Sequence, residues 1–208
     1  MPAIKNIIFD LGNVLLDIDF KKVTRAFELL GIQHFEKQYS QLEANELFQQ
    51  LETGKISSVD FYTIIQSQVS INLTKEDIQL AWNAILCDFR KESMEYLKTL
   101  TEKYRLFLLS NTNAIHLAEI NAILLKQMGE NNLSNYFEKA YYSQVVGMRK
   151  PHENIFYHVM NDAKINPIET LFVDDAFPNI ATAKKLGFAT HWLLPEERVE
   201  KVIPLQLI

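Results

Sequence analysis

Apolar residues are spaced along the chain in a way that predicts alternating strands and helices. Short apolar runs rich in β-branched and aromatic residues are typical of buried strands. We expect strands at residues 4–9, 104–109, 140–143, 170–173 and 189–194. Because these runs are apolar at nearly every position, both faces of the sheet should be covered, as in parallel sheets whose strands are joined by helices. The expected fold class is therefore α/β, with a three-layer, doubly wound parallel sheet.

A long helical segment interrupts this alternation after the first expected strand. About ninety residues separate that strand from the second, which is far more than one crossover needs. Helical spacing and capping residues, such as Thr74 with Asp77 three positions later, predict several helices here. The helices are expected at residues 20–30, 39–52, 58–69 and 74–86, with a further one at 91–102. We therefore expect a helical-bundle cap domain (residues 17–89) inserted into an α/β core domain (residues 1–16 and 90–208).

Composition and charge narrow the classes of function. Of the 208 residues, 48% are hydrophobic and 23% charged, so the chain can bury an ordinary core. The formal net charge of −5 argues against the basic surface of a nucleic-acid binder. A single cysteine excludes an internal disulfide, and no apolar run reaches the roughly 18 residues of a membrane span. We expect a cytoplasmic protein whose partner is a small molecule, neither nucleic acid nor membrane, and the sequence is compatible with a monomer.

Polar residues follow the expected strands at the points where the strands end. They are Asp10 after the first strand, Ser110 and Asn111 after the second, Lys150 in a loop beyond the third, and Asp174 and Asp175 after the fourth. Because the carboxyl ends of parallel strands meet at one edge of the sheet, these side chains should lie together. Carboxylates that bind a divalent ion, a hydroxyl donor and a lysine charge are the groups that phosphoryl transfer requires, since its transition state spreads negative charge over oxygens.

Each of these signals also has a purely structural interpretation. Asp10 could open a turn, Ser110 could cap the next helix, and a lone lysine such as Lys150 is usually a surface charge. The adjacent carboxylates of Asp174 and Asp175 repel each other unless a cation or hydrogen-bond donors lie between them, although a capped, hydrated turn remains an alternative. The order of the signals in the chain therefore carries the functional interpretation.

Four motifs in this order resemble those of the haloacid dehalogenase-like hydrolase superfamily. The motifs are Asp10-Leu11-Gly12-Asn13-Val14, Leu108-Leu109-Ser110-Asn111, Gly147-Met148-Arg149-Lys150-Pro151, and Phe172-Val173-Asp174-Asp175 with Asn179. The resemblance covers nearly the whole chain, including the helical insertion, and it implies a Rossmann-like core with a helical cap. Within the superfamily, the residues of these motifs are similar to those of a subgroup of bacterial sugar phosphatases that includes an α-glucose-1-phosphatase.

The resemblance also implies a role for each matching residue. Asp10 would be the nucleophile that forms an aspartyl-phosphate intermediate. Lys150 would offset negative charge between Asp10 and the phosphate, whereas Ser110 and the backbone N–H of Asn111 would bind the phosphoryl oxygens. The ligands of a Mg²⁺ cofactor would be the Asp10 carboxylate, the Gly12 backbone carbonyl and Asp175, with Asp174 on the ion or just behind its ligands.

The implied activity is that of a Mg²⁺-dependent phosphatase for a small phosphorylated metabolite, such as a hexose 1-phosphate. One residue departs from the pattern. Most phosphatases and phosphomutases of the superfamily carry a second Asp two residues after the nucleophile as general acid and base, and this chain has Gly12 there. Either another acid replaces it, with Asp17, Asp19 and Glu46 as candidates, or the substrate has a leaving group that needs little protonation. The anomeric oxygen of a sugar 1-phosphate would suit the second case.

Two alternative functions stay open at this stage. A β-phosphoglucomutase-like phosphomutase is disfavoured because Gly12 supplies no acid for transfer between two hydroxyls. A non-catalytic protein of the same fold could sense a phosphate ligand through movement of the cap. In either case we expect the cap to close over the strand ends and to help select the ligand. The candidates for that selection are charged and aromatic residues of the cap, among them Phe48, Trp82 and Arg90. Of the five histidines, only His116 is close in sequence to the Ser110 loop.

Overall fold

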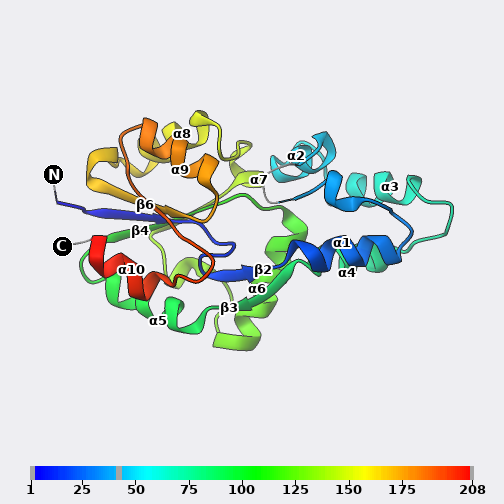
Figure 1. Cartoon of the computed structure of the whole chain (residues 1–208), viewed down its shortest axis with the longest axis horizontal. Helices are drawn as coiled ribbons and strands as arrows, with labels where there is room; N and C mark the ends of the chain where they lie inside the picture. The colour runs from blue at the N-terminus through cyan, green and yellow to red at the C-terminus, as the bar shows by residue number, and fades with distance from the viewer. Residues whose placement is uncertain (1–2, 41–43, 207–208) are drawn as a thin grey trace.

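The computed structural model describes residues 3–40 and 44–206, which form an α/β part and a helical part side by side (Figure 1). The strands are β1 (Asn6–Phe9), β2 (Leu16–Ile18), β3 (Leu86–Phe89), β4 (Arg105–Ser110), β5 (Lys139–Tyr142), β6 (Thr170–Asp174) and β7 (Ala189–Trp192). The central sheet has the strand order β5-β4-β1-β6-β7, and all neighbouring pairs in it are parallel. All five expected strands are present in this sheet.

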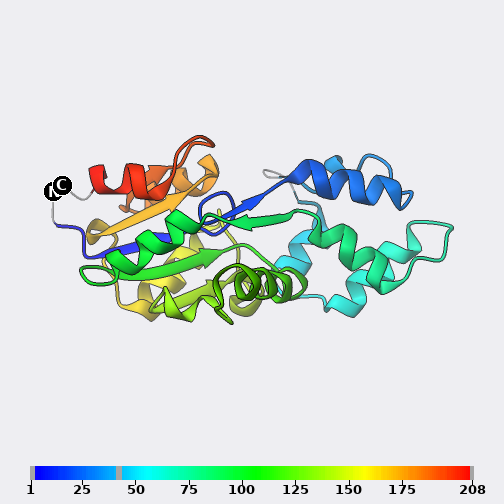
Figure 2. The ribbon, with the colours of Figure 1, turned by 90° about the horizontal axis from the view of Figure 1, so that it is seen from below.

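Helices cover both faces of the sheet. The helices of the α/β part are α5 (Lys91–Leu100), α6 (Ala114–Met128), α7 (Ser143–Val146), α8 (Glu153–Ala163), α9 (Phe177–Lys185) and α10 (Val199–Gln206), with short 3-10 helices η2 (Leu133–Asn135) and η3 (Pro167–Glu169). Figures 1 and 2 show α8 and α9 on one face and α5, α6 and α10 on the other. Successive strand residues point to opposite faces, so Ile7 and Phe9 of β1 join one core cluster and Ile8 joins the other. The three-layer prediction is confirmed.

The helical part has a core of its own. Its helices are α1 (Phe20–Leu29), α2 (Glu46–Glu52), α3 (Ser58–Ser67) and α4 (Lys75–Asn83), with a 3-10 helix η1 (Phe35–Lys37). Trp82 is fully buried among the rings of Phe35 and Phe48. Thr74 and Asp77 form the capping box at the start of α4 that their spacing predicts. The domain boundaries at residues 17 and 89 stay a prediction.

The sequence predictions for this part were wrong in two places. The helix expected at residues 39–52 begins only at Glu46, because the side chain of Asn45 caps it by accepting a hydrogen bond from the Phe48 backbone N–H; residues 41–43 of that prediction lie outside the described part of the chain. The helix expected at residues 74–86 ends at Asn83, and β3 follows it.

A two-stranded antiparallel ribbon of β2 and β3 lies between the two parts, and the sequence analysis missed it. The chain enters the helical part directly after β2 and leaves it directly before β3. Strands of three and four residues are too short for an alternating pattern to be recognised. In the ranges that the structure describes, no helix has the length and apolar character needed to cross a membrane.

Candidate active site

The residues singled out in the sequence meet at the carboxyl edge of the central sheet. Asp10 directly follows β1, Ser110 ends β4 and Asp174 ends β6. One carboxylate oxygen from each of Asp10, Asp174 and Asp175 lies within 4.8 Å of the other two. A pocket at this edge is lined by Asp10, Gly12, Ser110, Asn111, Lys150 and Asp175, among other residues. The expected convergence of separate motifs on one edge is therefore observed.

Lys150 is buried at the centre of the carboxylate cluster. Its Nζ lies 2.7 Å from Asp10 Oδ1 and 2.7 Å from Asp174 Oδ2, and its side chain is only 1% exposed. Burial alone would lower the pKa of Lys150, but Asp10 and Asp174 outweigh it and raise that pKa. The interpretation of Lys150 as a surface charge is therefore wrong, and its ammonium ion links the end of β1 to the end of β6.

Hydrogen-bond donors hold the two adjacent carboxylates. Asp174 accepts a hydrogen bond from the Ala176 backbone N–H at Oδ1 and two from Asn179 Nδ2, one at each oxygen. Asp175 Oδ2 accepts one from Asn13 Nδ2 at 3.0 Å. Asn13 has a φ of 52°, a left-handed conformation that Asn tolerates better than most residues. Lys150 and these donors explain how two neighbouring carboxylates can end a buried strand.

The carboxyl group of Asp10 is perturbed by its surroundings. Burial raises the pKa of Asp10 to about 7; Asp174 and Asp175 act in the same direction, and Lys150 opposes them. Burial and the neighbouring Asp174 also raise the pKa of Asp175. Three carboxyl groups thus lie close together beside one ammonium ion, which pairs with Asp10 and Asp174. The site therefore has an excess of potential negative charge that a bound cation would offset.

The loop after β4 is fixed against the loop that carries Lys150. Asn111 Nδ2 donates to the Lys150 carbonyl and Asn111 Oδ1 accepts from the Lys150 N–H, both at 2.9 Å. Ser143 Oγ makes a similar pair of hydrogen bonds with the backbone of Thr112. Ser110 lines the pocket, and its hydroxyl has no hydrogen-bond partner among the residues described. The side chain of Asn111 therefore holds the loop in place, whereas Ser110 lines the pocket with a hydroxyl that no described residue engages.

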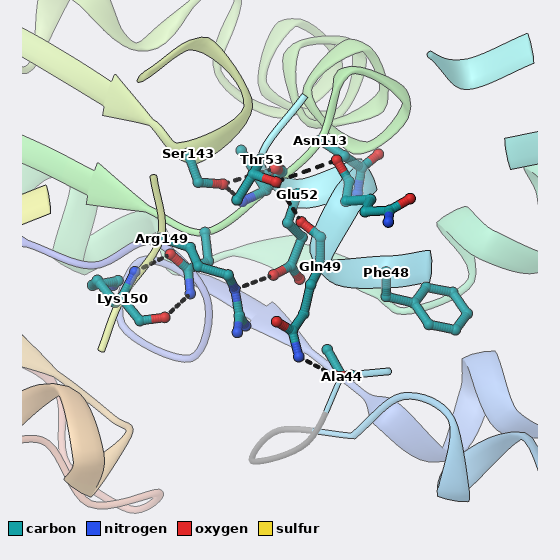
Figure 3. Close-up of polar contacts among 12 residues, drawn as sticks. Ala44, Phe48, Gln49, Glu52, Thr53, Asn113, Ser143, Arg149 and Lys150 are labelled. Atoms are coloured by element: carbon teal, nitrogen blue, oxygen red, sulfur yellow. Dashed lines mark hydrogen bonds and ion pairs between the residues drawn. The ribbon is translucent and has the colours of Figure 1, made fainter. Parts of the chain in front are cut away.

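Tyr39, Glu52 and Arg149 also line this pocket, and the sequence analysis gave none of them a role. Arg149 Nε lies 2.9 Å from Glu52 Oε2, and the Tyr39 hydroxyl donates to Glu52 Oε1 at 3.1 Å. Figure 3 shows Arg149 extending from the loop of Lys150 to Glu52 on α2. One signal was available, because Phe48 and Glu52 are one helical turn apart and a glutamate on the buried face of an amphipathic helix is unusual.

The candidate replacement acids lie elsewhere. Asp17 forms an ion pair of 2.7 Å with Arg90, Asp19 caps α1, and Glu46 accepts a hydrogen bond from Gln50. None of the three is among the described residues that line the pocket of Asp10. The interpretation of Arg90 as a substrate-selecting residue is not supported by this placement either, because its side chain is buried against Asp17 and the Val14 carbonyl.

The aromatic candidates are packing residues of the helical part, and His116 of α6 contacts one of them. Phe48 and Trp82 are fully buried in the core of the helical part. His116 stacks on Trp82 and contacts Asn113 through Nδ1. These rings are absent from the described lining of the pocket, so their placement indicates a packing role.

Gly12 packs closely against Ile18. A Cβ added to Gly12 would come within 2.9 Å of Ile18 Cδ1. Ile18 is the last residue of β2, and it also lines the pocket. A side chain at position 12 would therefore require the terminal methyl group of Ile18 to shift.

Comparisons with known proteins agree with this geometry. The model of the haloacid dehalogenase-like hydrolase family matches residues 4–187. The chain is 35% identical over 187 residues to D-ribitol-5-phosphate phosphatase from Bacteroides thetaiotaomicron, covering 90% of each protein.

Solved structures show the same likeness. A wild-type haloacid dehalogenase-family enzyme from Bacteroides thetaiotaomicron, crystallised with magnesium and inorganic phosphate, superposes with a TM-score of 0.88 at 33% identity, covering 96% of this chain and 99% of that one. A predicted family hydrolase from Porphyromonas gingivalis gives a TM-score of 0.90 at 34% identity, covering 99% of this chain and 98% of that one. This chain belongs to the haloacid dehalogenase-like hydrolase family.

Proposed function

We propose that this hydrolase is a Mg²⁺-dependent phosphatase that cleaves a small phosphorylated metabolite. The observation that carries the proposal is the cluster of Asp10, Asp174 and Asp175 around the buried ammonium group of Lys150, beside the hydroxyl of Ser110. The similarity to a named sugar-alcohol phosphatase supports it, as does the likeness to a family enzyme that binds magnesium and phosphate.

The donor set fits Mg²⁺, which prefers carboxylate and carbonyl oxygens. Asp10, Asp175 and the Gly12 carbonyl would hold the ion. Asp174 would stand just behind them, because both of its oxygens already accept hydrogen bonds from protein donors. When bound, Mg²⁺ offsets the charge of the carboxylates and of the phosphoryl group.

The residues of the chain would then act in two steps. A carboxylate oxygen of Asp10 attacks phosphorus, the bond from phosphorus to the ester oxygen breaks, and an aspartyl-phosphate forms. The ester oxygen leaves as an alkoxide and takes a proton from water to become the alcohol. A water molecule then attacks the same phosphorus, which releases inorganic phosphate and restores Asp10. Lys150, the Ser110 hydroxyl and the Asn111 backbone N–H would bind the phosphoryl oxygens as their charge increases.

Two classes of phosphate ester are candidate substrates, each on a different ground. A hexose 1-phosphate has a leaving oxygen that needs little protonation, which suits the glycine at position 12. A pentitol 5-phosphate is the substrate named for the relative from Bacteroides thetaiotaomicron. The lack of an acid at Gly12 still disfavours a phosphomutase. We further propose that the helical part (α1–α4 with η1) is the cap that closes over the substrate.

A panel of phosphate esters tests the proposal. Glucose 1-phosphate, glucose 6-phosphate and ribitol 5-phosphate would be assayed with Mg²⁺ and with EDTA, for the wild type, Asp10→Asn and the exposed-site control Asp162→Asn. We expect activity that needs Mg²⁺ and is lost only in Asp10→Asn. Equal specificity constants for the two glucose esters would count against the leaving-group argument. Hydrolysis in EDTA, or full activity of Asp10→Asn, would contradict the mechanism, and inactivity towards the whole panel would favour the sensing alternative.

A further inference from the structure

An arginine–glutamate pair crosses the boundary between the helical part and the α/β part. Glu52 lies at the end of α2, and Arg149 directly precedes Lys150. Their side chains are 4% and 19% exposed, and both residues line the pocket that contains Asp10. The helical part thus brings a charged side chain to the pocket, where Arg149 meets it (Figure 3).

The backbone holds this contact in place. Gly54, two residues after Glu52, has a φ of 65°, and a Cβ added to it would lie 2.4 Å from the carbonyl oxygen of Gln144 in α7. The end of α2 therefore rests directly on the backbone of the α/β part. Glu52 accordingly meets Arg149 from an anchored helix rather than from a loop.

The pair leaves hydrogen-bonding groups available to a ligand. Arg149 contacts Glu52 through Nε, and the terminal nitrogens of its guanidinium group have no hydrogen-bond or ion-pair partner in the ranges 3–40 and 44–206. Glu52 accepts one hydrogen bond at each carboxylate oxygen, and each such oxygen can accept more than one. Tyr39 adds a hydroxyl to the same wall of the pocket.

The charge of the pair indicates what it would bind. Arg149 and Glu52 neutralise each other, so this wall offers no net positive charge to a second phosphate or a carboxylate. A hydroxyl group can instead accept from a guanidinium N–H and donate to a carboxylate oxygen. Adjacent hydroxyls of a sugar or sugar alcohol match such a wall, whereas the phosphoryl group has Lys150 and Ser110.

We propose that Arg149 binds hydroxyl groups of a polyol leaving group, and that Glu52 is the positioning residue that fixes the guanidinium group for this contact. The inference rests on the proposed function, because the polyol would be the alcohol that the phosphatase releases. It assigns substrate selection to the pair rather than to the buried rings of Phe48 and Trp82.

Two esters that differ only in hydroxyl groups test the inference. Ribitol 5-phosphate and pentyl phosphate have the same five-carbon chain, and pentyl phosphate lacks the hydroxyls. KM and kcat would be measured for the wild type, Arg149→Gln, Arg149→Lys and Glu52→Gln. The matched control is Arg105→Gln, which breaks an exposed arginine–glutamate pair with Glu138. A carboxylate-bearing ester, 2-phosphoglycolate, serves as the third substrate.

We expect Arg149→Gln to lower the ratio of kcat/KM for ribitol 5-phosphate over pentyl phosphate about tenfold or more, mainly through KM. Glu52→Gln should lower the ratio less, and Arg105→Gln should leave it unchanged. Arg149→Lys should recover part of the ratio, and it keeps the test valid where the glutamine variant fails to fold.

Three outcomes would overturn the inference. An unchanged ratio in Arg149→Gln, or an equal loss towards both esters, would make the pair a structural contact between the two parts. A loss greatest for 2-phosphoglycolate would make Arg149 an anion-binding residue. Wild-type inactivity towards all three esters would also overturn this inference, and the proposed phosphatase function would fall with it only if glucose 1-phosphate were not hydrolysed either.

Discussion

Replacing Lys150 with methionine should expose how strongly the carboxylate cluster depends on its internal cation. Methionine keeps most of the length of the lysine side chain but lacks the ammonium group and its charge. In the wild type, the ammonium group lies 2.7 Å from both Asp10 and Asp174, and Lys150 is 1% exposed. The variant would leave these carboxylates facing each other with Asp175 nearby and without the ammonium ion between them.

The size of the effect follows from this burial. Removing one partner of a buried ion pair costs about 3–5 kcal/mol, because the remaining charge stays buried without compensation. The hydrogen bonds from Asn179 and Ala176 to Asp174 survive the substitution, so the lower end of that range is the more reasonable expectation. The control Lys185→Met breaks a 2.6 Å ion pair with Glu153 whose lysine is 74% exposed, and solvent already screens that pair.

The free energy of unfolding of the wild type and both variants would be measured with urea at pH 8, in EDTA and in Mg²⁺. We expect Lys150→Met to lose stability in EDTA and Lys185→Met to unfold at the wild-type midpoint. Mg²⁺ should stabilise Lys150→Met more than the wild type, because the ion enters a more negative site and binds only the folded state. A wild-type midpoint for Lys150→Met in EDTA would refute the view that Lys150 holds the cluster together.

Three further predictions concern the residues around the site. A Cβ at position 12 would lie 2.9 Å from Ile18 Cδ1, so Ile18→Ala makes room for it. Gly12→Asp with Ile18→Ala should hydrolyse glucose 6-phosphate at least about tenfold faster than Ile18→Ala alone; equal rates would contradict a missing-acid defect. Burial lowers the pKa of His116 to about 4, so the folded state prefers the neutral ring. The protein should therefore keep its full stability from this residue above pH 6.5 and lose it as the pH falls towards 4. Between pH 7 and pH 4.5, the free energy of unfolding measured by urea titration should fall by about 2–3 kcal/mol more in the wild type than in His116→Gln. Equal losses in the two proteins would argue against a neutral, buried His116 ring. Gly54→Ala should destabilise the protein more than Gly129→Ala, since both have positive φ but only Gly54 faces a carbonyl oxygen; similar thermal unfolding temperatures would contradict the close contact of α2 with α7.

The parts of the fold that depend on local patterns could be predicted from the sequence. The strands of the central sheet are apolar on consecutive positions, and β1 shows the reason, since Ile7 and Ile8 are buried on opposite faces. The capping box of Thr74 and Asp77 fixed the start of α4 correctly. The start of α2 was misplaced because Asn45 interrupts an otherwise helical pattern with its cap.

The site could be predicted only as far as strand ends define it. Asp10 and Asp174 come together because β1 and β6 are neighbours in a parallel sheet. The contact of Glu52 with Arg149 joins residues 97 positions apart in different parts of the molecule. It depends on how α2 rests on α7, which no local pattern of the sequence specifies.

The most direct test of the account is whether a phosphoryl group becomes attached to Asp10 during turnover. A radiolabelled substrate would be mixed with the enzyme and Mg²⁺, the reaction quenched in acid within milliseconds, and the labelled peptide mapped. We expect a hydroxylamine-sensitive label on the peptide that contains Asp10 and no label in Asp10→Asn. A label that resists hydroxylamine, or one that persists in Asp10→Asn, would contradict the central claim.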